Sequence, residues 1–223
     1  MTGRGSVLLA ALGERARRLS PEMLAYVSGP PDPSGWGVGR GEFEIAGSRF
    51  GPLLRLARPI LGPGMLVTRR ERRVPFTVVD RPWSSGDGEP ALATGRVFGF
   101  RGGSQRFIDV LLTGPEPGAL RNVLGARGRV ELLLDCGVDA EGRLILRSRS
   151  MRLRIGRRRL RLPRLLGIAA ESATGFDAER QCYTISARAR HPVLGTVLEY
   201  RGDFAYEHLP GPAGCHSPEQ TAA

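Results

Sequence analysis

Segments in which apolar and polar residues alternate follow one another from Val74 to Tyr206, and this period of two constrains the fold most strongly. Successive side chains of a β-strand point to opposite faces, so such segments become strands with one buried face. The clearest runs from Arg129 to Val138. Short breaks such as Gly102-Gly-Ser104 have the composition of hairpin turns. Roughly eight strands joined in this way predict an antiparallel sheet.

Helical patterns are few. Ser6 to Leu19 is expected to form a short helix, and Ser20 can cap a second one with Pro21 in its first turn. From Phe50 to Leu61, apolar residues recur at helical spacing with arginines between them. This helix has two interpretations: it covers one side of a sheet, or it lies on a membrane surface as a cationic amphipathic helix.

Strands that outnumber helices predict an α+β fold, a strongly curved antiparallel β-sheet or open barrel covered by two to four helices. Residues 1–30 are expected to form an N-terminal helical segment that packs on the domain. Residues 31–207 form the curved-sheet domain, in which Ala119 to Leu124 is a short turn of helix. Residues 208–223, rich in Pro, Gly and Ser, are expected to be a disordered tail.

The net charge of +11 comes from arginine, because all 33 basic residues are Arg. Such a surface attracts polyanions. Arginine without lysine, beside abundant Gly, Ala and Pro, is also what a GC-rich genome produces without selection for binding. The charge alone therefore does not predict a nucleic-acid partner.

Arginines crowd between Arg147 and Arg164, where Arg152 and Arg154 point away from the apolar face of their strand. They would form a cationic ribbon able to bind phosphates. Proteins that bind single-stranded nucleic acid also use aromatic stacking, and this segment contains no aromatic residue. The alternative is an edge strand protected by its charge.

Glycine occupies every second position from Gly35 to Gly41, so one face of this strand carries no side chains. A bare face admits another backbone or a ligand, with Trp36 nearby as a candidate contact. A phosphate-binding loop is excluded because the chain continues as a strand from Glu42 instead of opening a helix.

Asp109 lies between Phe107 and Leu111 on a mostly apolar face. If that face lines a cavity, Asp109 is a candidate catalytic acid or base, because burial would raise its pKa. The alternative is a carboxylate on an edge strand or a partner for an arginine.

The last strand, Thr196 to Tyr206, places Leu198, Tyr200, Gly202, Phe204 and Tyr206 on one face and Glu199, Arg201 and Asp203 on the other. The charged trio is a site or cross-strand surface pairing. The catalytic candidates are then Asp109 and Tyr200. The ligand-binding candidates are Trp36, Phe107, Tyr200 and Arg201, and the anion-binding candidates are Arg152 and Arg154.

Metal and cofactor sites are not predicted. The three histidines lack the spacing of zinc motifs, and the odd set Cys136, Cys182 and Cys215 contains no close pair. Free thiols, no long apolar segment and no signal peptide lead us to expect a cytoplasmic protein without a transmembrane segment.

The chain resembles an uncharacterised bacterial family, domain of unknown function four-one-six-six, from the Ser20 helix to about Glu207. The resemblance lies in Arg40-Gly-Glu-Phe43, Phe50-Gly-Pro-Leu-Leu-Arg-Leu56, Leu162-Pro163 and, most specifically, Pro192-Val-Leu-Gly195 through Tyr200-Arg-Gly202. A Trp-x-Arg-x-Phe strand common in the family lacks its Trp here, in Arg96 to Gly103. Members also occur fused to saccharopine-dehydrogenase-like oxidoreductases, so the resemblance implies an oxidoreductase partner but supplies no catalytic residues.

The leading functional hypothesis is a domain that binds a small apolar or lipid-like ligand on the concave side of the sheet, or that assists an oxidoreductase. One alternative is a small enzyme that uses an acid–base carboxylate. Another is a polyanion-binding module that uses the arginine ribbon.

Overall fold

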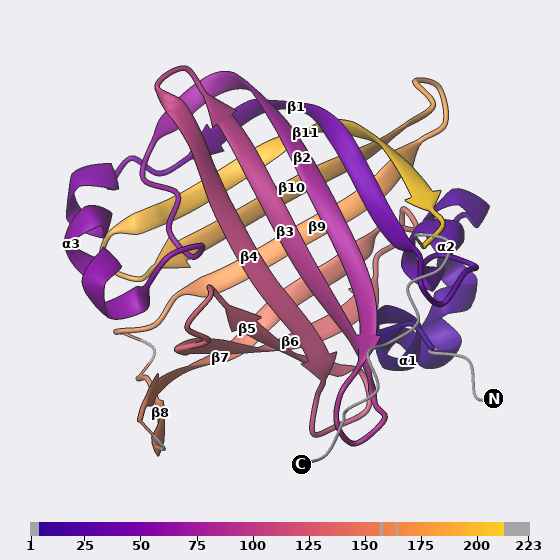
Figure 1. The fold of residues 1–223 in the computed structure, drawn as a ribbon, viewed down its shortest axis with the longest axis horizontal. Coiled ribbons are helices and arrows are strands. Elements are labelled where there is room, and N and C mark those ends of the chain that lie inside the picture. The colour runs from indigo at the N-terminus through magenta and orange to yellow at the C-terminus, as the bar shows by residue number, and fades with distance from the viewer. Residues whose placement is uncertain (1–4, 157, 164, 212–223) are drawn as a thin grey trace, which may run out of the picture.

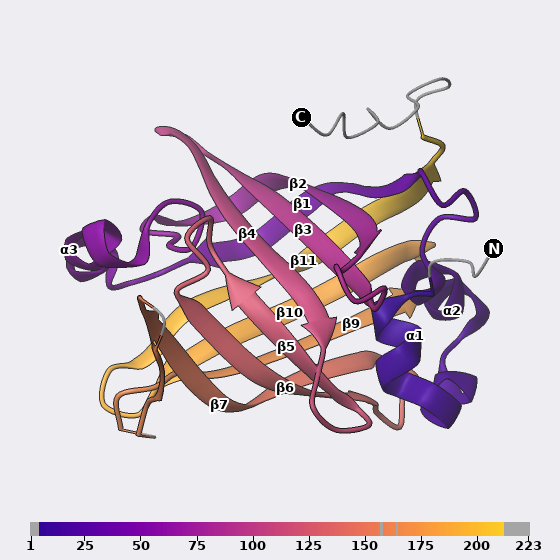
Figure 2. The same cartoon turned by 60° about the horizontal axis from the view of Figure 1, so that its bottom comes forward.

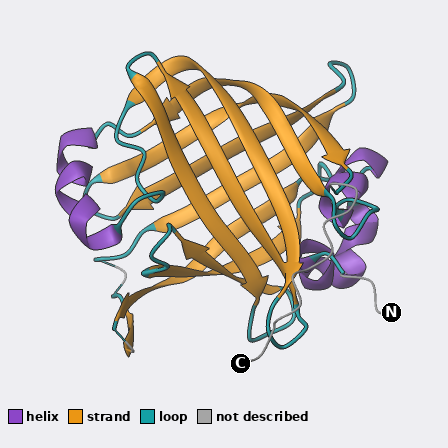
Figure 3. Ribbon diagram, viewed as in Figure 1, coloured by secondary structure: helices purple, strands orange, loops and turns teal. Residues whose placement is uncertain are grey.

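The computed structural model describes residues 5–156, 158–163 and 165–211. One antiparallel sheet dominates it (Figures 1 and 3). The strands are β1 (Trp36–Gly47), β2 (Arg70–Ser84), β3 (Pro90–Phe100), β4 (Gly103–Thr113), β5 (Ala119–Leu124), β6 (Val130–Val138), β7 (Leu144–Ile155), β8 (Arg158–Arg161), β9 (Ala169–Asp177), β10 (Cys182–His191) and β11 (Gly195–Leu209).

Ten of these strands form a closed barrel. Each strand of the ring pairs with the next one along the chain, β8 extends β7 outside the ring, and the last strand, β11, pairs with the first, β1. The strong curvature and antiparallel pairing predicted from the sequence are confirmed. The prediction of an open barrel needs correction, because β1 and β11 pair from Trp36–Leu209 to Gly47–Glu199 and so join the first strand of the ring to the last.

Two glycines explain why β1 and β11 can close the ring. A Cβ atom on Gly41 would lie 2.0 Å from the carbonyl oxygen of Asp203, and one on Gly202 would lie 2.1 Å from that of Glu42. The backbones therefore approach more closely than any side chain permits. Gly41 belongs to the bare face predicted from the sequence, and Gly202 lies in the Tyr-Arg-Gly motif of the last strand.

Further along β1, aromatic side chains cover the bare face. A Cβ atom on Gly37 would lie 1.8 Å from the Tyr206 hydroxyl, and one on Gly39 would contact Val78 and Phe204. The missing side chains thus make room for residues of the protein itself.

The helices lie at the two ends of the barrel (Figure 2). At one end, α1 (Val7–Leu12), the 3₁₀ helix η1 (Gly13–Arg18) and α2 (Pro21–Ser28) pack together; at the other lies α3 (Gly51–Leu61). The Ser20 hydroxyl accepts a hydrogen bond from the Met23 amide at 3.2 Å, which confirms the predicted cap. Among the described residues, no helix is long and apolar enough to cross a lipid bilayer.

Ala119 to Leu124 forms strand β5, so the expected turn of helix is wrong. β4 and β6 bind this segment from both sides, and Leu120 and Leu124 face the core. Pairing with two neighbouring strands decides the conformation of so short a segment.

Two clusters of buried side chains fill much of the barrel. One joins α1 and α2 to β4–β7, and the other is an aromatic layer in which Phe43 and Phe76 stack at 3.7 Å between ring centroids. Cys136 is buried in the first cluster, Cys182 is partly exposed, and neither is in a disulfide. Cys215 and the predicted tail from residue 212 lie outside the described residues, whereas His208 and Leu209 belong to β11.

Candidate functional site

An apolar cavity of about 260 Å³ occupies the barrel interior toward α3. Strands β3–β7 and β9–β11 contribute to its wall, and Leu54 and Leu61 of α3 line it as well. An apolar cavity of roughly 150 Å³ is already large enough to take up benzene. This one can hold a larger apolar molecule or a segment of an alkyl chain.

Small side chains on β9 and β10 create this space. Ala189 pairs with Ala170 and Ala187 with Ser172, and all four residues line the cavity. The facing wall carries large residues, among them Leu111, Leu132, Leu134 and Met151. Along β9 and β10 the small side chains therefore leave space that the large residues of the facing wall do not fill. Protein interiors are normally packed tightly, so this space is an exception.

A buried ion pair lines the cavity, together with the exposed residues Glu171 and Arg188. Arg96 Nη1 donates a hydrogen bond to Asp109 Oδ1 at 2.6 Å, with the side chains 19% and 4% exposed. The Arg96 guanidinium also lies 6.0 Å from the centre of the Phe107 ring. Burial by itself lowers the pKa of Arg96, but Asp109, Tyr200 and Asp80 together raise that pKa above its ordinary value. The guanidinium is thus a fixed positive charge, neutralised by Asp109.

Two further polar groups line the same cavity. Burial raises the pKa of Tyr200, so its hydroxyl stays protonated and can donate a hydrogen bond. The side-chain oxygen of Asn122 is buried and has no hydrogen-bond partner within the described part of the chain. A buried acceptor of this kind costs free energy until a donor reaches it.

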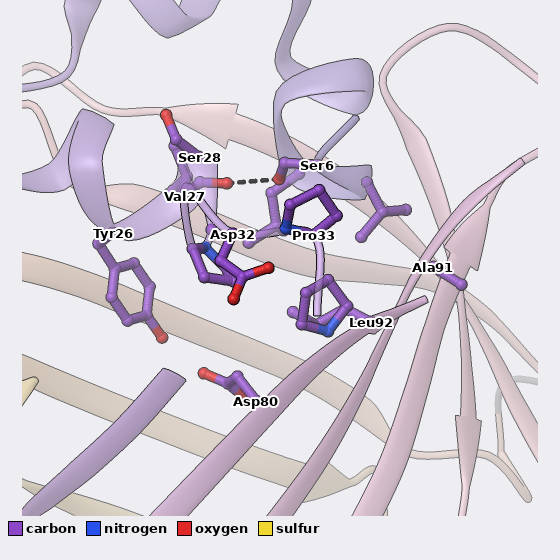
Figure 4. Close-up of a pocket in the computed structure, with 14 residues that line it drawn as sticks. Ser6, Tyr26, Val27, Ser28, Asp32, Pro33, Asp80, Ala91 and Leu92 are labelled. Atoms are coloured by element: carbon purple, nitrogen blue, oxygen red, sulfur yellow. Dashed lines mark hydrogen bonds between the residues drawn. The ribbon is translucent and has the colours of Figure 1, made fainter. Parts of the chain in front are cut away.

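A second, smaller cavity of about 50 Å³ lies between α1, α2 and the ends of β2 and β3. Figure 4 shows Tyr26 and Asp80 beside it, and the Ser6 hydroxyl donating a hydrogen bond to the Val27 carbonyl. Because one water molecule needs roughly 10–15 Å³ measured in this way, the cavity has room for a few waters but not for a lipid.

Asp80 connects this small cavity to the ion pair. It accepts a hydrogen bond from the Tyr206 hydroxyl at 3.0 Å, and burial raises its pKa against the opposing effect of Arg96. Asp80, Thr94 and Asp109 are direct neighbours across β2, β3 and β4. We call Asp80, Thr94, Arg96 and Asp109 the polar belt. These residues run across strands β2, β3 and β4, from the small cavity at Asp80 to the large cavity at Arg96 and Asp109.

The structure brings together three residues selected from the sequence. Phe107, Asp109 and Tyr200 all line the large cavity. Asp109 is the partner of an arginine, one of the two alternatives that the sequence left open; it is not on an edge strand, because β4 pairs with both β3 and β5.

The other candidates lie elsewhere. Trp36 begins β1 and belongs to neither cavity lining. Arg201 lies on the outer face and pairs with Glu44 at 3.0 Å, as expected for cross-strand surface pairing. Arg152 pairs with Glu131 at 3.4 Å, and Arg154 is exposed near the end of β7.

Sequence reasoning missed Asp80, Arg96 and Asn122. The signal was present, since Asp80 continues the inward series Val74, Phe76 and Val78, and Arg96 lies two residues before Phe98. A charged residue in phase with apolar ones is an inward charge. Asn122 was hidden because its segment was interpreted as helical.

Comparison with known proteins places this arrangement in a family. Residues 19–204 match the model of a family described as domain of unknown function (DUF4166). The uncharacterized protein YndH of Bacillus subtilis (strain 168) is 29% identical over 171 residues, which cover 74% of this chain and 80% of that relative. The matched range runs from just before α2 into β11 and includes every residue named above as lining the large cavity. The chain therefore belongs to the DUF4166 family.

Proposed function

We propose that this protein binds one small apolar or lipid-like molecule inside its barrel. The observation that carries the proposal is the apolar cavity of about 260 Å³ with a few polar groups at one side. Binding sites for small molecules commonly have this composition, an apolar wall with a small number of placed polar groups.

The polar groups favour a neutral head group on the ligand. Asp109 already neutralises Arg96, so a carboxylate beside this pair would add an uncompensated negative charge in a poorly solvated place, away from the exposed Arg188 that also lines the cavity. A hydroxyl or amide group adds no charge. It can donate to the Asn122 oxygen and accept from Tyr200 or from a remaining N–H group of Arg96.

The alkyl part of such a ligand would lie along the leucine-rich wall toward α3. Burial of alkyl surface contributes roughly 0.8 kcal/mol per methylene group, so affinity should rise with chain length until the cavity is full. A long-chain alcohol, a fatty amide or a monoacylated glycerol fits this description.

Two measurements test the proposal. The first is organic extraction of the purified protein followed by mass spectrometry of any lipid. The second is the fluorescence of the neutral dye N-phenyl-1-naphthylamine, which brightens in apolar cavities, and its displacement by dodecanol, dodecanamide and dodecanoate. We expect the two neutral compounds to displace the dye at concentrations about tenfold lower than dodecanoate, because each 1.4 kcal/mol changes affinity tenfold.

A matched pair of variants tests whether the dye fluorescence comes from binding in the cavity. Ala189→Phe fills the space beside β10 and should weaken dye binding at least tenfold. Ala205→Phe adds the same side chain to an exposed position on β11 and should leave dye binding unchanged. No dye binding and no extracted lipid, or equal effects of both variants, would refute the proposal.

A further inference from the structure

We propose that the α3 end of the barrel docks on the surface of an anionic lipid bilayer, so that the cavity faces the membrane. This inference deepens the proposed function and rests on it, because docking would give a membrane-derived ligand direct access to the cavity.

Exposed apolar side chains gather at this end. They lie on the described residues of three structures, which we call the docking face: α3, the β7–β8 hairpin with residues 165–168 after it, and the β10–β11 turn. The most exposed members are Leu56 at 76% and Val193 at 75%, and Ile155, Leu160 and Leu165 are also at least half exposed. Large exposed apolar patches mark surfaces that contact a partner or a membrane.

The three structures lie at the same end of the barrel. The last residue pair between β1 and β11, Gly47 with Glu199, places the start of α3 close to the β10–β11 turn. Figure 1 shows α3 and β8 at the end of the barrel opposite α1 and α2, and Figure 2 shows α3 there from a second side.

The docking face carries an excess of positive charge, although Glu131 and Glu199 at its border pair with Arg152, Arg159 and Arg70. The sequence segments 48–70, 152–170 and 188–198, which supply it, contain no aspartate or glutamate. Arg55, Arg154, Arg158 and Arg190 are exposed there, and none of the four takes part in a salt bridge within the described residues. Each unpaired arginine near an anionic membrane surface adds roughly 1 kcal/mol of attraction.

The opposite end differs in charge. Its loops and helices mix both signs: Glu14, Glu22, Asp87, Glu116 and Asp177 lie in the same elements and loops as Arg15, Arg17, Arg18 and Arg180. An anionic surface would therefore orient the molecule with α3 toward it and with α1 and α2 away from it.

The chemistry of the exposed side chains favours a bilayer over a nucleic acid. The large side chains exposed on the docking face are aliphatic, and these insert between lipid chains while neighbouring arginines contact the phosphates. Nucleic-acid surfaces of this kind instead present aromatic rings for base stacking.

Helix α3 joins the docking face to the cavity. Leu54 and Leu61 line the cavity, whereas Leu53 and Leu56 are exposed on the same helix. Arg127 Nη1 donates a hydrogen bond to the Pro59 carbonyl at 2.6 Å, which attaches the end of α3 to the β5–β6 turn. If α3 binds the membrane through its exposed leucines, the cavity that Leu54 and Leu61 line would lie next to the bilayer surface.

Co-sedimentation with vesicles tests the inference. We expect the protein to bind vesicles of equal parts phosphatidylglycerol and phosphatidylcholine, and to bind phosphatidylcholine vesicles at least tenfold more weakly. Raising NaCl from 0.1 M to 1 M should release it, because salt screens exposed charges. Equal binding to both vesicle types would overturn the inference. So would tight binding of a single-stranded oligonucleotide together with absent vesicle binding.

Matched variants locate the contact. The pairs Leu56→Ser with Val193→Ser, and Arg158→Glu with Arg190→Glu, should each weaken vesicle binding at least tenfold. Leu24→Ser and Arg81→Glu change exposed residues away from the docking face and should leave vesicle binding unchanged. Thermal unfolding checks that each variant is folded, and equal losses in test and control variants would contradict the proposed face.

The dye assay without vesicles separates the two proposals. The docking-face variants should lose vesicle binding and keep dye binding, whereas Ala189→Phe should lose dye binding and keep vesicle binding. Failure of vesicle binding with normal dye binding refutes docking alone. Failure of dye binding with normal vesicle binding refutes the proposed function alone.

Discussion

Arg96 and Asp109 form an ion pair inside the barrel, 2.6 Å from Nη1 to Oδ1, although they are not direct neighbours in the sheet. Arg96 lies opposite Phe107, and Asp109 lies opposite Thr94, so the pair is diagonal on the inner face of β3 and β4. In this geometry the Arg96 side chain contacts Asp109 and also lines the cavity. The ion pair holds these two side chains of the polar belt in place on the barrel wall.

Asp109→Asn should destabilise the protein by about 2–4 kcal/mol, because it leaves the buried guanidinium of Arg96 without its counter-charge. The double replacement Arg96→Met with Asp109→Leu should recover most of that loss, since no unpaired charge remains. Urea unfolding of the single and double variants measures both effects. A loss below about 0.5 kcal/mol for Asp109→Asn would mean that the pair is not coupled to folding.

Gly41→Ala should destabilise the barrel by about 2–3 kcal/mol or prevent folding, because its Cβ atom would meet the backbone of β11 where the ring closes. Gly95→Ala is the matched control within a strand, since its Cβ atom would have no neighbour closer than 3.9 Å. Thermal unfolding compares the two. Similar melting temperatures for both variants would contradict the close approach of β1 and β11.

Asp80 should make stability depend on pH. Burial raises its pKa above the ordinary value of 3.8, so the folded protein holds this proton at pH values where the unfolded chain has released it. The contribution of Asp80 is fully present below the unfolded pKa and is lost as pH rises through the folded pKa. The free energy of unfolding of the wild type, minus that of Asp80→Asn, should therefore fall as pH rises above about 4. A difference that stays constant or increases with pH would contradict the raised pKa.

The two described cysteines should react differently with iodoacetamide. Burial raises the pKa of the Cys136 thiol to about 12 and shields it beneath the N-terminal helices. Cys182 is partly exposed on β10 and should be alkylated in the native state. In a Cys215→Ser background, mass spectrometry should find modification at Cys182 first, with Cys136 protected until the protein unfolds. Equal rates at both thiols would show that α1 and α2 do not cover the barrel end.

Local patterns predicted much of the fold, because they depend on neighbouring residues alone. Ser20 and Pro21 determined the start of α2, and period-two alternation determined the inner face of β11, with Tyr200, Phe204 and Tyr206 pointing inward. The same alternation placed Asp109 on the inner face of β4 before any partner was known.

The tertiary structure alone decided the closure of the ring and the location of the cavity. Closure requires Gly41 and Gly202, 161 positions apart, each to lie against the backbone of the opposite strand, opposite Phe204 and Phe43, and no local period encodes that pairing. The cavity arises because small side chains such as Ala170 and Ala189 from two strands meet on one wall, and the charge of Arg96 is balanced only where β3 lies beside β4. Whether a volume stays empty, and whether a buried charge is neutralised, depends on side chains from distant segments, and only the folded chain brings these together.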